Sequence, residues 1–202
     1  VVIDSGTAQA GTVVLVADSG AQVTSGAKAF TQLEDGNITK VNPDSGVLGS
    51  RVTITGTNLL AGGNEITVEL DSVEAEITAQ SDTEIEIIVQ DAPKGDAASV
   101  VITADTGATI TLGESWTYLE PGNVTSLTPA EGQVGTVVVI EGTSLFAGGS
   151  SIEKVTLNGV EVASISGTQT AEKIEVVVAA GDKTDAATDV VMISDIGTKI
   201  TG

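Results

Sequence analysis

The residues of this chain that could do chemistry are almost all acidic. Aspartate and glutamate together number 28, lysine and arginine number 8, and the formal net charge is −20. Histidine and cysteine are absent, which removes the commonest general base, all thiolate metal ligands and all disulfides. A serine or threonine nucleophile would have no histidine beside it to accept its proton. We therefore predict that the chain is not an enzyme.

Acidic residues gather near the predicted loops and domain joints, where carboxylates and backbone carbonyls together bind calcium in other proteins. The candidate ligands for such a site are Asp35, Asp44 and Glu120. The Asp-x-Asp-x-Asp-Gly run of helical calcium sites does not occur, and elsewhere the acids alternate along predicted strands. We favour a solvated acidic surface and keep a calcium site as the alternative. No other cofactor is expected.

Two asparagines begin sequons for N-linked glycosylation, in Asn37-Ile-Thr39 and Asn123-Val-Thr125. Because the two sites stand at equivalent positions of a repeat, they are one observation made twice. We expect glycans at both asparagines if the chain is secreted by a eukaryote. The alternative is that each asparagine merely caps a turn at a domain joint.

The charge and the hydropathy pattern exclude two classes of partner. A surface of net charge −20 repels nucleic acid and anionic membranes. No apolar run approaches the ~20 residues of a membrane helix, so no membrane insertion is expected. No signal peptide opens the chain, and Val1–Ile3 is typical of mid-strand sequence. We expect a mature or excised piece of a longer protein.

The elements that would position these residues come from an internal repeat. Residues 37–63 recur as residues 123–149 with the same glycines and prolines, which indicates short domains in tandem. We predict that residues 1–36 are the C-terminal part of an incomplete repeat and residues 37–122 a complete repeat. Residues 123–202 are then a repeat that lacks its last strand.

The sequence of each repeat predicts many short strands separated by turns. Apolar and polar residues alternate, and turn signals recur every 8–12 residues or so, which predicts an immunoglobulin-like sandwich. We expect one strand over residues 73–78, one over 160–165, and a hairpin turn at Asn158-Gly159. The complete copy should end in two strands, over residues 108–112 and 115–119. The links between copies are three or four residues long, which favours stiff joints.

The aromatic residues near the end of the complete copy are expected to pack inside the protein. Trp116 and Tyr118 are two residues apart in a predicted strand and should share one face. We expect Trp116 to lie in a core or a domain joint. The alternative is an exposed platform that stacks on carbohydrate.

The repeated pattern Ile/Val-x-x-Val/Leu-x-Pro-x-x-Gly-x-x-Gly-x-x-Val-x-Ile-x-Gly-Thr-x-Leu resembles the IPT/TIG family. The residues that carry it in the two copies are Pro43, Gly46, Gly49, Val52, Ile54, Gly56 and Leu59, and then Pro129, Gly132, Gly135, Val138, Ile140, Gly142 and Leu145. The ending Trp116-Thr-Tyr118 also resembles the family's aromatic-x-Tyr ending. The resemblance implies an all-β fold of tandem immunoglobulin-like sandwiches, and the short links between the copies predict a rod-like array. It implies function less strongly, because the family occurs in surface receptors, bacterial and algal surface proteins, transcription factors and starch-acting enzymes.

Two departures from the family narrow the expected function. The paired cysteines of receptor-type members and the basic loops of DNA-binding members are both absent. We therefore expect a structural segment of an extracellular or cell-surface protein, acting as stalk, spacer or filament element. Its expected partners are neighbouring copies of the same repeat, including head-to-tail association in which strands near Val13–Phe30 complete the last domain of another chain. The alternative is an adhesin or a module that binds a glycan or another surface ligand.

Overall fold

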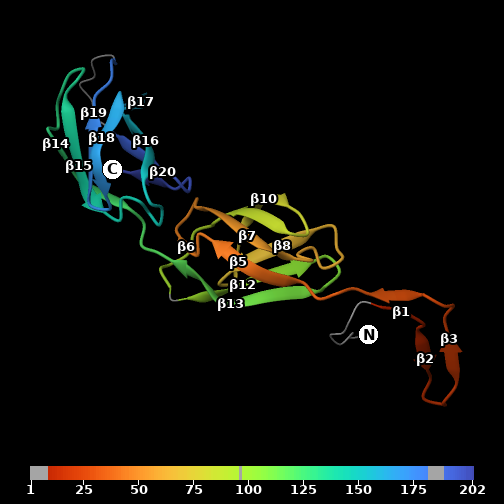
Figure 1. Cartoon of the computed structure of the whole chain (residues 1–202). Coiled ribbons are helices and arrows are strands. Elements are labelled where there is room, and N and C mark those ends of the chain that lie inside the picture. The colour runs from red at the N-terminus through yellow and green to blue at the C-terminus, as the bar shows by residue number, and fades with distance from the viewer. Residues whose placement is uncertain (1–8, 96, 182–188) are drawn as a thin grey trace.

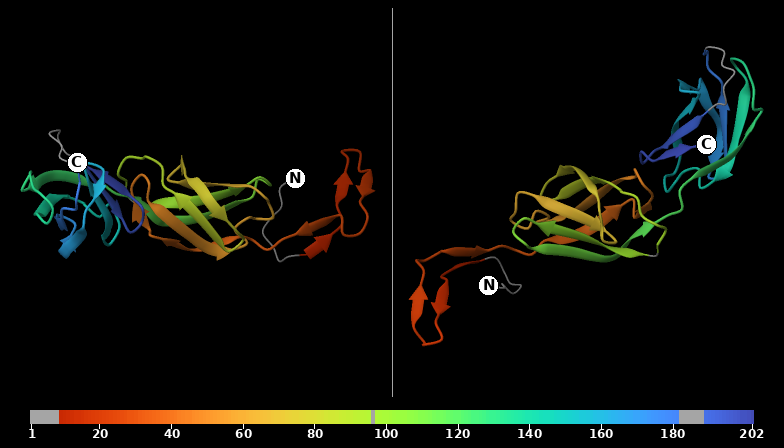
Figure 2. Two further views of the ribbon diagram at one scale, coloured as in Figure 1. Left: turned by 90° about the horizontal axis from the view of Figure 1, so that it is seen from above. Right: turned by 180° about the vertical axis from the view of Figure 1, so that it is seen from behind.

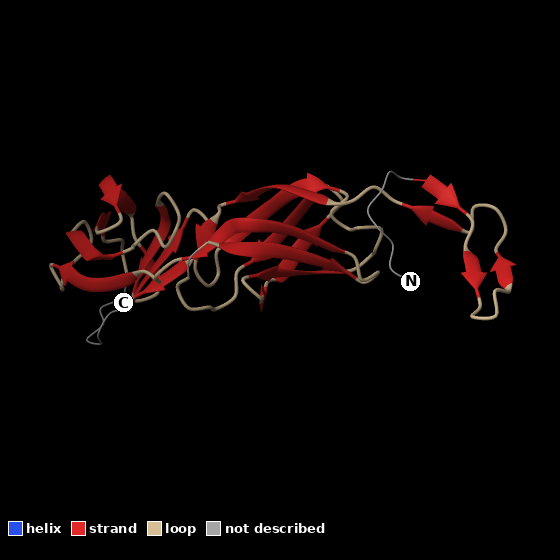
Figure 3. Ribbon diagram, turned by 90° about the horizontal axis from the view of Figure 1, so that it is seen from below, coloured by secondary structure: helices blue, strands red, loops and turns tan. Residues whose placement is uncertain are grey.

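The computed structural model of this chain describes residues 9–95, 97–181 and 189–202. These residues form strands and loops without a helix, so none of them forms a helix that could cross a membrane (Figure 3). A first segment (residues 9–36) leads into a middle domain (37–122), which is followed by a last domain (123–202) (Figure 1). The strand expected at Val1–Ile3 lies outside the described residues.

The first segment consists of two short ribbons that project from the middle domain (Figure 2). In one ribbon β1 (Gln9–Gly11) pairs antiparallel with β4 (Phe30–Gln32). In the other, β2 (Val14–Val16) pairs antiparallel with β3 (Gln22–Thr24). The apolar side chains of these ribbons are exposed, and Leu15 is 60% exposed. The β2–β3 hairpin therefore carries the apolar residues that strands normally bury, but no other described element covers them.

The middle domain is a sandwich of two sheets with strand orders β10-β11-β7-β5 and β6-β13-β12-β8-β9. All pairs are antiparallel except β6 with β13, which is parallel. The strands are β5 (Asn37–Asn42), β6 (Ser45–Gly46), β7 (Arg51–Thr57), β8 (Ile66–Leu70), β9 (Val73–Glu74), β10 (Glu76–Gln80), β11 (Glu84–Ile88), β12 (Ala98–Ala104) and β13 (Thr109–Tyr118).

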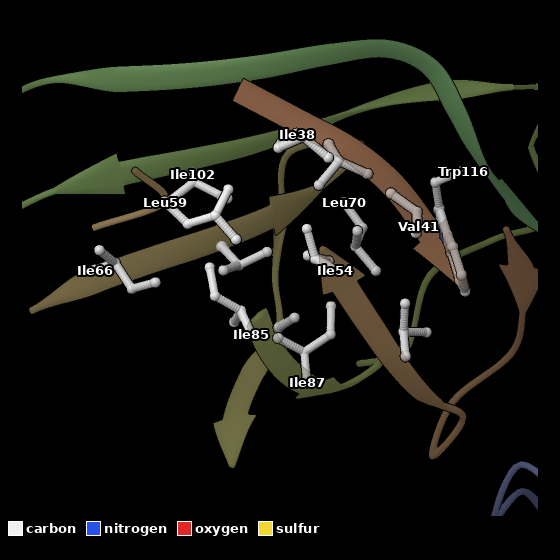
Figure 4. Close-up of a cluster of buried hydrophobic side chains, with 14 of the residues drawn as sticks. Ile38, Val41, Ile54, Leu59, Ile66, Leu70, Ile85, Ile87, Ile102 and Trp116 are labelled. Carbon is white, nitrogen blue, oxygen red and sulfur yellow. The ribbon is translucent and has the colours of Figure 1, made fainter. Parts of the chain in front are cut away.

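Alternating side chains of both sheets fill the space between them. Ile54 of β7 and Ile102 of β12 are fully buried, while the residues beside them in sequence are more exposed. Figure 4 shows these isoleucines, Leu70 and Trp116 meeting between the sheets. The pattern is what strands with one face toward the core require. It confirms the predicted immunoglobulin-like sandwich.

The two aromatic residues of β13 lie in this core, as predicted from their spacing. Trp116 is 0% exposed and Tyr118 is 2% exposed. Their ring centroids lie 5.7 Å apart with the planes at 85°, an edge-to-face contact. The Tyr118 hydroxyl donates a hydrogen bond to the Leu70 carbonyl at 3.4 Å. Trp116 is therefore no carbohydrate platform.

The last domain repeats the architecture with sheets in the orders β14-β15-β19-β18 and β17-β16-β20-β21. Its core includes Ile140, Ile174 and Met192, each 0% exposed. Its strands are β14 (Asn123–Thr128), β15 (Val137–Thr143), β16 (Ile152–Leu157), β17 (Val160–Glu161), β18 (Ser164–Thr170), β19 (Lys173–Val177), β20 (Val190–Ser194) and β21 (Lys199–Thr201).

The structure corrects three strand predictions. Residues 73–78 form two strands rather than one, because the chain crosses between the sheets at buried Ala75, whose N–H bonds to the Val68 carbonyl at 2.8 Å. Residues 160–165 divide in the same way into β17 and β18. In contrast, the two strands expected over 108–112 and 115–119 are one long strand, β13, in which Glu114 has φ 49°.

The hairpin turn predicted at Asn158-Gly159 is confirmed. Both residues have positive φ, 51° and 76°, and the turn joins β16 to β17. This is the left-handed backbone that a two-residue hairpin needs and that asparagine and glycine tolerate best.

Candidate functional site at the domain joints

The joint between the middle and last domains is built from one loop and one turn. We call Gly46–Arg51 the pole loop of the middle domain and Ile196–Thr198 the pole turn of the last domain. The pole loop is held by its own bonds: the Ser50 hydroxyl accepts the N–H of Val47 at 3.0 Å. The Gly49 N–H donates to the Val89 carbonyl at 2.9 Å, and Gly49 has φ 84°. The loop is thus a preformed surface.

The pole loop docks on the pole turn through buried polar contacts. The Arg51 N–H donates to the Ile196 carbonyl at 2.8 Å. The hydroxyls of Ser50 and Thr198 lie 2.9 Å apart, and these residues are 0% and 1% exposed. Each buried hydroxyl therefore has its partner in the other domain, and separating the domains would leave both to be resolvated.

The pole loop also contributes an apolar side chain to the neighbouring domain. Val47 belongs to the middle domain by sequence, but it is 6% exposed and packs in the hydrophobic core cluster of the last domain. Leu119, in the link between the domains, packs against the same cluster. The last domain therefore completes its core with residues of the middle domain.

The link brings the two backbones close together. Within the middle domain, the Leu119 N–H donates to the Gly46 carbonyl at 2.8 Å, which holds the link beside the pole loop. A Cβ on Gly148, which has φ 94°, would lie 3.2 Å from the Leu119 Cδ1 and 3.2 Å from the Gly46 Cα. Only glycine leaves room for this approach.

An aspartate supports the pole turn from inside the last domain. The Asp195 carboxylate accepts hydrogen bonds from the Ser150 N–H at 3.0 Å and from the Ser150 hydroxyl. Partial burial alone would raise the pKa of Asp195, but hydrogen bonds from Ser150, Ser151 and Ile196 outweigh it and lower that pKa. The carboxylate thus fixes the strand end from which the pole turn projects.

The joint between the first segment and the middle domain contains a short link equivalent to that of the other joint, but among the described residues no pole loop lies against it. Leu33 stands where Leu119 stands, and it lies against Gly62 as Leu119 lies against Gly148. Beside it is a hollow of about 970 Å³, lined in part by Phe30, Leu33, Gly62 and the turn Thr106–Ala108. Phe30 is 42% exposed, the most open of the four aromatic residues.

Both sequon asparagines lie at the starts of edge strands and are exposed. Asn37 begins β5 and also lines the hollow, and Asn123 begins β14. The sequon hydroxyls donate within the sheet, from Thr39 to the Thr55 carbonyl at 3.0 Å and from Thr125 to the Glu141 carbonyl at 3.1 Å. Glycosylation of the asparagines stays a prediction.

The three residues expected as calcium ligands are divided between the two joints. Asp35 belongs to the first joint, where its carbonyl accepts from the Asn58 amide at 3.5 Å. Asp44 precedes the pole loop, and Glu120 lies in the link between the middle and last domains. In the part of the chain that the structure describes, no three acidic side chains gather to hold a metal ion. A calcium site stays a prediction.

Sequence reasoning expected stiff joints from the short links but did not find the residues that make the joint. Ser50, Arg51 and Thr198 carry no motif that marks them as contacts. One signal was in the sequence: Val47 is an apolar residue in a turn-rich loop, and the equivalent residue of the next repeat is Gln133. If only one of two equivalent loops contacts a neighbouring domain, an apolar residue is needed in that loop and not in the other, as Val47 and Gln133 differ here.

The comparisons with known proteins agree with this architecture. The family model described as the IPT/TIG domain matches residues 37–118 and 123–201. A sequence comparison with curated proteins finds no significant match.

Two solved structures of plexin A4 share the fold at low sequence identity. A plexin A4 extracellular region, domains 1 to 10, has a TM-score of 0.59 and 19% identity over 95% of this chain and 17% of the plexin chain. A second plexin A4 structure has a TM-score of 0.54 and 20% identity over 82% and 18% of the chains. The protein SGBP-B from a xyloglucan utilization locus of Bacteroides uniformis has a TM-score of 0.36 and 16% identity over 83% and 48%. This chain thus spans less than a fifth of the plexin chains.

Proposed function

Because the chain belongs to the IPT/TIG domain family, with two consecutive domains of that fold, we propose that it is a structural segment of an extracellular or cell-surface protein. It acts as a stalk or spacer that holds its neighbours at a fixed distance and angle, and it performs no catalysis. One observation carries this proposal. Val47 of the middle domain lies in the core cluster of the last domain.

The contacts of the joint are worth enough to limit bending. Rotation about the link would break the Arg51–Ile196 and Ser50–Thr198 hydrogen bonds, each worth roughly 1 kcal/mol net. It would also expose Val47, which costs about 1.5 kcal/mol or more. A total of about 3.5 kcal/mol keeps the open joint below roughly one molecule in a hundred. That is the behaviour of a spacer.

The surface suits a place outside the cell. The net charge of −20 keeps a repetitive β protein soluble and discourages lateral association. The plexin A4 chains that share the fold are described as extracellular regions, which supports the same place for this chain.

Stiffness is tested by a distance measurement between the domains. Since the chain has no cysteine, spin labels at Ala79→Cys and Glu153→Cys report one middle-to-last distance by pulsed electron spin resonance. We expect a single narrow distribution, and a broad one when Val47→Asp is added. A broad distribution without that change would overturn the spacer proposal. Antibody labelling of intact, unpermeabilised source cells tests the location, and labelling that needs permeabilisation would refute it.

One observation favours a second candidate function, the binding of a glycan. Phe30 is exposed in the hollow, and exposed aromatic rings stack on sugar faces. Calorimetric titration with a panel of oligosaccharides, compared between the chain and its Phe30→Ala variant, tests it. Binding that is lost in the variant would support this candidate, and the lack of any binding would remove it.

A further inference from the structure

The hollow at the first joint is the empty counterpart of a joint that is filled elsewhere in the same chain. Thr106–Ala108 is the pole turn of the middle domain, equivalent to the pole turn Ile196–Thr198. Thr198 is 1% exposed beneath the pole loop, whereas all three residues of the middle-domain turn are exposed. A Cβ on Gly197 would lie 3.2 Å from the Arg51 Nε, but one on Gly107 would have nothing within 4 Å.

The matching surface is uncovered at the other end of the molecule. Gly132–Val137 is the pole loop of the last domain, equivalent to Gly46–Arg51. Val134 is 63% exposed and Val137 is 50% exposed. The chain therefore carries one uncovered pole loop and one uncovered pole turn, besides the pair that is already docked.

Both uncovered surfaces keep the conformation of the docked pair. The Gln133 N–H donates to the Thr136 hydroxyl oxygen at 2.9 Å, as that of Val47 does to Ser50 at 3.0 Å. Gly135 and Gly49 both have φ 84°. In the turns, Gly107 and Gly197 have φ 84° and 83°. Little conformational entropy would be lost on docking, because neither surface has to be ordered first.

We propose that the hollow at the first joint binds the pole loop of the last domain, Gly132–Val137, of a second copy of this chain. The inference rests on the proposed function and deepens it by naming the partner. The Val137 N–H of one copy then donates to the Thr106 carbonyl of the other, as Arg51 donates to Ile196. Gly132 of one copy lies against the Phe30 ring of the other, because Phe30 stands at the position of Trp116 in its repeat; within the middle domain, a Cβ built on Gly46 would lie 3.1 Å from the Trp116 Cη2.

This contact joins unlike surfaces, so it leads to a head-to-tail array of copies rather than a two-fold symmetric dimer. The link of the second copy, residues 33–36, takes the place that residues 119–122 take in the docked joint. The array would thus continue from copy to copy with the same kind of joint that the chain already contains.

The contact between copies is weaker than the one within the chain. Gln133 replaces the buried Val47, and Ala108 offers no hydroxyl to Thr136 where Thr198 serves Ser50. Both sides carry acid, since Glu34 and Asp35 line the hollow and Glu131 precedes the loop. These like charges repel, and salt screens them. Added sodium chloride should therefore strengthen the association.

Disulfide trapping tests the proposal, because the chain has no cysteine of its own. One full-length chain carries Ala108→Cys and the other Thr136→Cys, the equivalents of Thr198 and Ser50. The control mixture replaces the first with Glu76→Cys, an exposed position at the start of β10, where it pairs with Ile88 at the end of the middle domain opposite to the hollow. A separate chain with both Ser50→Cys and Thr198→Cys reports the joint within one molecule, where the hydroxyls are 2.9 Å apart.

We expect the first mixture to form the cross-linked pair at least about tenfold faster than the control, because docking raises the local thiol concentration. The rate should rise with salt. Equal rates in the two mixtures, with ready closure of the Ser50→Cys, Thr198→Cys pair, would overturn this inference and leave the spacer proposal standing. Failure of that internal pair would count against the spacer itself. An oligosaccharide that protects the cysteine at position 108 without any cross-linking would assign the hollow to a glycan and refute the docking of a second copy.

Discussion

Replacing Val47 with alanine should destabilise a domain to which this residue does not belong by sequence. Val47 is 6% exposed and packs in the last domain's cluster, not in that of its own domain. Loss of two methyl groups, at about 0.8 kcal/mol each plus a small cavity, gives about 2 kcal/mol. With a urea slope of about 1–1.5 kcal/mol/M, the last domain's midpoint should fall by roughly 1–2 M.

Two optical probes separate the domains. Trp116 is the only tryptophan and lies in the core of the middle domain, so its fluorescence follows that domain alone. Far-ultraviolet circular dichroism follows both. We expect Val47→Ala to move the part of the dichroism transition that the fluorescence does not share.

The matched control is Gln133→Ala, at the equivalent position of the uncovered loop, which should change stability by less than about 0.5 kcal/mol. A last-domain transition that does not move, or a shift confined to the Trp116 signal, would refute the reasoning.

Three further predictions concern the core and the surface. Trp116→Ala should cost about 3–5 kcal/mol of middle-domain stability in urea. Trp116→Phe should cost much less, because the buried indole N–H has no hydrogen-bond partner among the residues that the structure describes. Equal losses in the two variants would contradict this. Burial, aided by the charge of Asp71, raises the pKa of Tyr118 from 10 to about 12 in the folded protein. Since the folded state favours the neutral phenol, the stability of the middle domain should be unaffected by the titration of this group below pH 10 and should fall between about pH 10 and 12. Tyr118→Phe should abolish that dependence of the urea midpoint, and a parallel loss in both chains would argue against it. Secretion from a eukaryotic cell should add glycan mass that Asn37→Gln and Asn123→Gln each reduce, and an unmodified mass would refute the sequon prediction.

Much of the fold follows from local patterns. Alternation placed Val52 and Ile54 on an inward face, and Asn158-Gly159 specified its turn, because each depends only on neighbours in sequence. The crossing at Ala75 was not predictable in this way. Both halves of residues 73–78 alternate correctly, and only the tertiary fold decides that one half joins β8 and the other joins β11.

The candidate site was less accessible to sequence reasoning. A short link predicts limited rotation, but the contact between Ser50 and Thr198 joins residues 148 positions apart. Serine and threonine hydroxyls on loops usually face water, so their residue types carried no signal. The asymmetry between filled and empty joints became visible only when the equivalent residues of the repeats were compared in exposure.

Residual dipolar couplings of the chain in a dilute aligned medium test the central claim most directly. The claim is that Val47, Ser50 and Arg51 of the pole loop hold the middle and last domains as one body. Amide couplings from each domain give an alignment tensor of their own. The account predicts one common tensor, with equal magnitude and orientation for both domains. Two tensors of different magnitude would show that the domains turn independently and would contradict the account.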